Sequence, residues 1–284
     1  MPSSRLWGVA NVLSHRVLTA LVLLPPFLAA VFLLPTSWFA LILAAVVVLA
    51  VLEWLPMIGL NRASVTWAVI GVLAGFMALV AGAVDEGVIT PAVLLAGVMF
   101  WPVAFILLWV HERSTRDAVA LAPGRGLLIG LLLLLPSWTA LVWLHAQPGG
   151  PWLVMLLLLI TWAADIGAYF AGRRFGRHRL APRVSPGKTW EGFAGGLLLA
   201  TVVGLLLRPL LPGMPLPLLP FFLLLILTIV LSVVGDLFES MVKRRAGMKD
   251  SGTLLPGHGG VLDRIDSVTA SATVFAGGLY LLWL

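Results

Sequence analysis

Long apolar segments decide what this chain can fold into. About nine of them run roughly over residues 16–34, 37–57, 64–84, 90–110, 126–146, 151–172, 191–208, 216–238 and 267–284. A helix needs about 20 mostly apolar residues to cross the hydrocarbon core of a bilayer. Only 11% of the residues are charged, whereas soluble domains carry about 25%. The sequence therefore predicts an all-α, polytopic transmembrane helical bundle of about nine spans.

The basic residues predict how these spans are oriented. Cytoplasmic loops of membrane proteins carry an excess of Lys and Arg. With a cytoplasmic N-terminus, 17 of the 18 Lys and Arg residues fall on the cytoplasmic side, and only Arg208 falls outside. We therefore expect the N-terminus inside and the C-terminus outside. The net charge of +6 then reflects topology, anionic lipids and phosphorylated substrates, and no nucleic-acid partner is expected.

Polar residues are distributed unevenly along the chain. Residues 1–150 hold few charges, mostly at span ends, and are interpreted as an N-terminal transmembrane scaffold of about five spans. Residues 151–284 are interpreted as a C-terminal catalytic region of about four spans, with two polar segments on the cytoplasmic side. The chain has no cysteine, which excludes disulfides and thiolate metal sites.

The first polar segment covers residues 165–192. Asp165 lies inside the sixth predicted span, where a carboxylate is costly and indicates a functional site. The sequence around Gly187 and Lys188 is not a Walker loop, because the pattern G-x-x-x-x-G-K-[ST] is absent and no strand is expected before it. A basic loop that only sets orientation is the alternative for the neighbouring arginines. The candidate substrate-binding residues of this segment are Asp165, Ser185, Lys188 and Glu191.

The second polar segment, residues 235–266, holds the denser set of charges. If the eighth helix continues past its apolar part, i, i+3, i+4 and i+7 spacing places four side chains on one face: Asp236, Glu239, Ser240 and Lys243. Asp263 and Asp266 likewise share a face at the start of the ninth helix. Two pairs of carboxylates therefore enter one region from two helices, with basic side chains between them.

This mixture of charges is typical of a metal-bound polyphosphate site. Carboxylate oxygens suit Mg²⁺, which also bridges to substrate phosphates, while Lys and Arg bind phosphate. The glycines around His258 would let backbone N–H groups approach phosphate oxygens. An internally neutralised, salt-bridged loop is the alternative; it explains the balance of charge but not the glycine run. His258 itself fits either a structural hydrogen bonder or an acid–base group.

The second segment resembles the signature of the phosphatidate cytidylyltransferases, also called CDP-diacylglycerol synthases. The matching pattern is Ser240-x₂-Lys243-Arg244-x₄-Lys249-Asp250-x₅-Pro256-x-His258-Gly259-Gly260-x₂-Asp263-Arg264-x-Asp266. Residues 165–176 and 185–192 also resemble this family, although Gly187 stands where many members carry a second lysine. The resemblance covers about residues 155–284, whereas residues 1–150 resemble the family mainly in hydropathy.

The resemblance implies an enzyme that converts CTP and phosphatidate into CDP-diacylglycerol and pyrophosphate. It implies Mg²⁺ at Asp236 and Asp263, potassium at a second site, and a homodimer. The catalytic candidates are Asp236, Lys243, Arg244, Lys249, Asp250, His258, Asp263, Arg264 and Asp266. Ser240, Gly259 and Gly260 join the substrate-binding candidates of the first segment. We expect an active site on the cytoplasmic side of a bacterial plasma (inner) membrane, among membrane lipids.

Two other functions fit parts of the sequence. Another CTP-dependent membrane lipid kinase, such as a polyprenol kinase, would share the metal and phosphate residues but would transfer the γ-phosphoryl group. A transporter is compatible with nine spans and with Asp165 inside the membrane. Transporters, however, place polar residues near the midplane of several helices, whereas the charges here gather at one face.

Overall fold

The computed structural model describes residues 24–82, 89–114, 121–211, 216–254 and 259–283. Within these ranges, eight helices are long and apolar enough to cross a membrane: α2 (Thr36–Met57), α3 (Ala63–Gly82), α4 (Ile89–Arg113), α5 (Pro123–Ala146), α6 (Gly150–Phe175), α7 (Trp190–Leu207), α8 (Leu218–Arg245) and α9 (Leu262–Trp283). A shorter apolar helix, Leu24–Leu33, precedes them. The rest of the first predicted span lies outside the described residues. The all-α polytopic architecture is confirmed.

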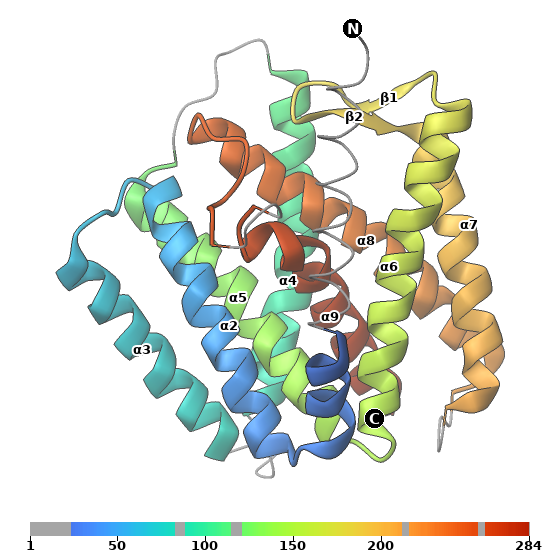
Figure 1. The fold of residues 1–284 in the computed structure, drawn as a ribbon, viewed down its shortest axis with the longest axis horizontal. Coiled ribbons are helices and arrows are strands. Elements are labelled where there is room, and N and C mark those ends of the chain that lie inside the picture. The colour runs from blue at the N-terminus through green and yellow to red at the C-terminus, as the bar shows by residue number, and fades with distance from the viewer. Residues whose placement is uncertain (1–23, 83–88, 115–120, 212–215, 255–258, 284) are drawn as a thin grey trace, which may run out of the picture.

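The helices run up and down, so that their connections gather at the two ends of the bundle (Figure 1). The α6–α7 and α8–α9 connections, which contain the middle parts of the two polar segments, lie at the same end as the last turns of α2 and α4 (Figure 1). Helix α9 packs against α4, α5 and α8 and is largely buried, whereas α3 and α7 lie at the edge of the bundle. The second polar segment therefore leads directly into the core.

Small residues bring α6 and α7 close together. A Cβ atom on Gly196 would lie 2.5 Å from the carbonyl oxygen of Ala164, and one on Gly167 would lie 2.6 Å from that of Gly195. In lipid, helices associate through such close packing, because the surrounding acyl chains remove the hydrophobic driving force. This contact fixes Asp165 on α6 relative to the chain that enters α7.

Replacing Gly196 by alanine tests this contact. We expect Gly196→Ala to destabilise the protein by about 1–3 kcal/mol, because the added methyl group overlaps the backbone of α6. Gly75→Ala on α3 is the matched control, since a Cβ atom there meets nothing within 4 Å. Thermal unfolding in detergent measures both variants. Equal midpoints for the two would contradict the close approach of α6 and α7.

A short β-hairpin connects α6 to α7. Strand β1 (Arg179–Ala181) pairs with β2 (Ser185–Thr189) in an antiparallel register that matches Arg179 with Thr189 and Ala181 with Ser185. The expectation that no strand precedes Lys188 was therefore wrong. Proline and glycine within β2 lower its strand propensity, so the pattern alone hides it.

Tertiary contacts compensate for this weak propensity. The carboxylate of Glu112, at the end of α4, accepts hydrogen bonds from the backbone N–H groups of Arg183 (3.2 Å) and Val184 (2.8 Å) at the turn of the hairpin. The Arg244 guanidinium on α8 donates a hydrogen bond to the carbonyl of Val184 (3.3 Å). The hairpin is thus anchored to α4 and α8.

Candidate active site

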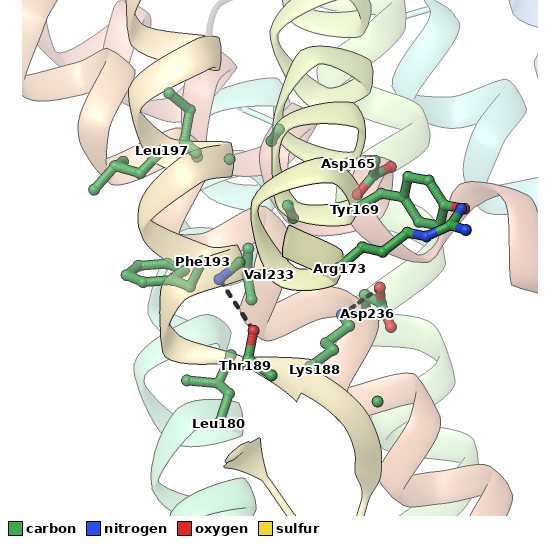
Figure 2. A pocket seen from close by; sticks show the side chains of 17 residues that line it. Asp165, Tyr169, Arg173, Leu180, Lys188, Thr189, Phe193, Leu197, Val233 and Asp236 are labelled. Carbon is green, nitrogen blue, oxygen red and sulfur yellow. Dashed lines mark hydrogen bonds and ion pairs between the residues drawn. The ribbon is translucent and has the colours of Figure 1, made fainter. Parts of the chain in front are cut away.

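A cavity of about 360 Å³ lies between α6, α7, α8 and β2. Its charged lining residues are Asp165 and Arg173 from α6, Lys188 from β2 and Asp236 from α8 (Figure 2). The rest of the lining is mostly small or apolar and comprises Ala164, Ala168, Gly172, Leu180, Phe193, Gly196, Leu197, Ile229 and Val233, among others. The cavity therefore combines charged groups with a hydrophobic wall at the polar end of the bundle.

An ion pair joins the two polar segments at this cavity. The Lys188 ammonium lies against the Asp236 carboxylate, and the two side chains are 29% and 24% exposed (Figure 2). The hydroxyl of Ser240, one turn further along α8, donates to Asp236 at 3.5 Å. The structure thus brings together residues that are separated by about 50 positions in the sequence, as expected from their common side of the membrane.

A second cluster of charges lies beside the first, between α8 and α9. The buried Lys243 ammonium contacts Asp263 and lies 3.2 Å from a carboxylate oxygen of Glu239. The Glu239–Lys243 and Asp236–Ser240 contacts confirm that these four residues share one face of a helix that continues to Arg245. The predicted end of the eighth span, residue 238, was too early because its charged last turns stay helical.

Asp263 also organises the connection between α8 and α9. Its second carboxylate oxygen accepts the backbone N–H groups of Ser251 (3.0 Å) and Gly260 (2.9 Å). Helix α9 starts at Leu262, whereas the sequence predicted a start at residue 267, because the two aspartates of the first turns lower the hydropathy there. Asp263 is therefore both a candidate metal ligand and a structural acceptor.

Other candidates from the second segment lie around these clusters. Asp266 is half-buried on α9, whereas Lys249, Asp250 and Arg264 are exposed. The exposed side chains form no hydrogen bond or ion pair with another described residue. His258 lies outside the described residues. The exposed Lys249 and Arg264 are therefore cations available to a ligand from the aqueous side.

Local structure explains why glycine occupies positions 259 and 260 of the signature. Gly259 has a φ of +79°, a conformation that glycine adopts at little cost. The N–H group of Gly260 donates a hydrogen bond to the Asp263 carboxylate, and a Cβ atom on Gly260 would overlap the Ser251 hydroxyl. For Gly260, close packing explains the absence of a side chain better than an approach to phosphate does.

Two candidates of the first segment do not line the cavity. The Glu191 carboxylate accepts the backbone N–H groups of Arg177 (3.1 Å) and His178 (3.2 Å) and lies 2.6 Å from the His178 ring, so it fastens the chain after α6 to the start of α7. Ser185 pairs with Ala181 at the start of β2. Asp165 and Lys188, by contrast, both line the cavity.

Sequence reasoning missed two carboxylates that support the site. Glu112 holds the hairpin, and the buried Glu53 on α2 accepts hydrogen bonds from the α8–α9 connection. Both were interpreted as residues that merely end a span. The rule that selected Asp165, a carboxylate within an apolar helix, would also have selected Glu53.

The carboxylates of the two clusters suit magnesium chemically. Among the described residues, no three Asp, Glu or His side chains form a metal site on their own. Asp236 and Asp263 each lie beside a lysine. Mg²⁺ is commonly held by one or two carboxylates and completed by substrate phosphates and water, so these two residues fit a metal that arrives with a nucleotide.

Comparisons with known proteins cover nearly the whole chain. A family model described as the cytidylyltransferase family matches residues 14–282. A phosphatidate cytidylyltransferase of Pseudomonas aeruginosa is 44% identical over 279 residues, which cover 95% of this chain and 97% of that protein. One of Haemophilus influenzae is 38% identical over 283 residues, covering 93% and 97%. One of Mycobacterium leprae is 37% identical over 227 residues, covering 67% and 71%.

Proposed function

The chain belongs to the cytidylyltransferase family, and from this premise we propose that it converts CTP and phosphatidate into CDP-diacylglycerol and pyrophosphate. The structural observation that carries the proposal is the Lys188–Asp236 ion pair, which joins both polar segments at a cavity with an apolar wall. The reaction needs a cation for the lipid phosphate, carboxylates for the metal-bound nucleotide, and a hydrophobic surface for the acyl chains.

The reaction is a displacement at the α-phosphorus of CTP. A phosphate oxygen of phosphatidate attacks this phosphorus, the bond from it to the oxygen that leads to the β-phosphate breaks, and pyrophosphate leaves with that oxygen. The attacking phosphate is already ionised at pH 7, so no strong general base is needed. The barrier comes from repulsion between two anions and from charge on the leaving group, and positioned charges lower both contributions.

The lipid phosphate is assigned to the cavity. Lys188 and Arg173 supply positive charge there, while Leu197 and Val233 belong to the apolar wall. The acyl chains would follow this wall into the bilayer, since α7 lies at the edge of the bundle (Figure 1). Asp165 lines the same cavity and would orient the cations rather than bind the phosphate itself.

The phosphates of CTP are assigned to the α8–α9 side. The exposed cations Arg244, Lys249 and Arg264 can reach an aqueous ligand, whereas the buried Lys243 is held by Glu239 and Asp263. We therefore assign Lys243 to the positioning of Asp263. Asp250, His258 and Asp266 remain candidates without a specific role.

Magnesium is proposed at Asp236 and Asp263. When bound, it would neutralise the triphosphate and the departing pyrophosphate. The support is the chemistry of the two carboxylates and their placement on neighbouring helices, α8 and α9. Potassium at a second site and a homodimer are proposed from the family resemblance alone.

A nine-span topology with the N-terminus inside and the C-terminus outside completes the proposal. It is supported by the partition of Lys and Arg and by the position of both polar segments at one end of the bundle (Figure 1). In a bacterial inner membrane this arrangement would face the site toward cytoplasmic CTP.

The released nucleotide product separates this function from the alternatives. Purified protein in detergent, given CTP, phosphatidate and Mg²⁺, is expected to release pyrophosphate only when phosphatidate is present. Release of CDP would instead indicate a kinase that transfers the γ-phosphoryl group. Absence of CTP turnover, with phosphatidate and a range of salts supplied, would overturn the proposal. A transporter would then be the hypothesis to test.

A further inference from the structure

Glu53 of α2 reaches the start of α9 from the N-terminal half of the chain. One of its carboxylate oxygens accepts the backbone N–H of Val261 (2.9 Å), and the other accepts the N–H of Leu262 (2.9 Å) and the hydroxyl of Ser251 (3.0 Å). The side chain is only 5% exposed. No Lys or Arg of the described residues forms an ion pair with it.

A buried carboxylate without a basic partner needs another source of positive potential. The first N–H groups of a helix have no partner within the helix, and they carry the positive end of the helix dipole. Val261 and Leu262 provide such groups at the start of α9, so Glu53 acts as a cap from another helix. Removing it would leave buried N–H groups unpaired, which is costly.

The surrounding glycines match the size of this carboxylate. A Cβ atom on Gly252 would lie 2.6 Å from one oxygen of Glu53, and one on Gly260 would lie 2.5 Å from the other. The α8–α9 connection therefore packs closely against Glu53 at two places, Gly252 and Gly260. Glu53 therefore contacts the α8–α9 connection both at Ser251 and at Val261 and Leu262.

Asp263 holds the same connection through hydrogen bonds of its own. It accepts the N–H groups of Ser251 and Gly260, while Glu53 accepts the Ser251 hydroxyl and the N–H of the residue after Gly260. A shift of the α9 start would therefore move Asp263 together with the exposed Lys249 and Arg264. The distance between these groups and the cavity depends on Glu53.

We propose that Glu53 is a positioning residue of the reaction, which fixes the start of α9 and thereby sets Asp263 and the CTP-binding cations against the lipid phosphate. The inference rests on the proposed function, because it assigns the α8–α9 side to CTP. It adds a residue of α2 to a site whose charged side chains come from α6, β2, α8, the α8–α9 connection and α9.

Glu53→Gln is the sharpest variant, because it preserves the shape of the side chain while it removes the negative charge and replaces one acceptor oxygen with an NH₂ donor. Both oxygens of Glu53 face N–H donors, so the amide NH₂ of glutamine must oppose at least one of them. Trp54→Phe is the matched control. Its neighbouring, equally buried indole donates to the carbonyl of Gly126 (3.0 Å), so this variant also loses one buried hydrogen bond from α2, but none to α9.

Steady-state kinetics and limited proteolysis test the two variants. For Glu53→Gln we expect kcat to fall about tenfold or more, as misplacement of catalytic groups does. We also expect a higher KM for CTP with an unchanged KM for phosphatidate. A general loss of folded protein would lower the apparent kcat and leave both KM values alone. Tryptic cleavage after Lys249, identified by mass spectrometry, should be faster in Glu53→Gln than in wild type or in Trp54→Phe.

The outcomes separate this inference from the proposed function. If the wild-type protein forms no CDP-diacylglycerol, the proposed function fails, and the proteolysis still reports on the anchoring of the connection. If the wild type is active but Glu53→Gln matches Trp54→Phe in kcat, in KM for CTP and in cleavage after Lys249, Glu53 does not position the site and the inference is wrong.

Discussion

Asp263→Asn is expected to reduce CDP-diacylglycerol formation by about a hundredfold or more, comparable to the loss of a preorganised charge-stabilising group in other enzymes. One oxygen of Asp263 faces the Lys243 ammonium and the other accepts two backbone N–H groups. Asparagine has one acceptor oxygen, so its NH₂ group must face either a cation or two N–H donors. The variant also loses the negative charge proposed to hold Mg²⁺.

The loss must be separated from a loss of fold. Thr273→Val, further along α9, is the matched control, since it removes a buried hydroxyl that donates only to the carbonyl of Thr269 within the helix. Both variants should elute as monodisperse protein in detergent, and only Asp263→Asn should show the large loss of activity. Wild-type activity in Asp263→Asn would remove Asp263 from the site.

Lys188→Met is expected to have an effect of similar size, about a hundredfold on activity, because it removes the cation assigned to the lipid phosphate. Lys188 is paired with Asp236 across the cavity, so the loss also leaves that carboxylate without its partner. Arg113→Met is the control: it removes a cation from the end of α4 that contacts Trp109 and does not line the cavity.

Exchanging the two partners distinguishes a catalytic pair from a structural one. The double variant Lys188→Asp with Asp236→Lys restores an ion pair between the same two positions and should recover thermal stability relative to Lys188→Met. It should not recover activity, because the cation and the carboxylate would then lie on the wrong elements for lipid phosphate and metal. Recovery of activity in the exchanged protein would show that the pair only supports the fold.

Much of the fold could be predicted because hydropathy reports directly on the membrane. The span predicted over 37–57 is observed as Thr36–Met57, and the one predicted over 191–208 as Trp190–Leu207. The errors fall where a helix is charged. Helix α8 continues through Lys243 to Arg245, and α9 begins before Asp263, because paired charges at the polar end of the bundle cost little in a helix.

The site could be predicted in part, for reasons that differ between residues. Helical spacing correctly placed Glu239 with Lys243 and Asp236 with Ser240, since those contacts are local. For Lys188 and Asp236, the topology predicts only that both lie near the same face of the membrane, and not that they form an ion pair. The contacts of Glu53 with residues about 200 positions away depend on how α2 packs, which no local pattern encodes.

The most direct test of the whole account is the fate of labelled phosphorus from CTP in the purified protein. With phosphatidate and Mg²⁺, label from the α-position should appear in a lipid whose mass is that of CDP-diacylglycerol with the supplied acyl chains, and label from the γ-position should appear in pyrophosphate. Label from the γ-position in the lipid, or no labelled lipid at all, would contradict it.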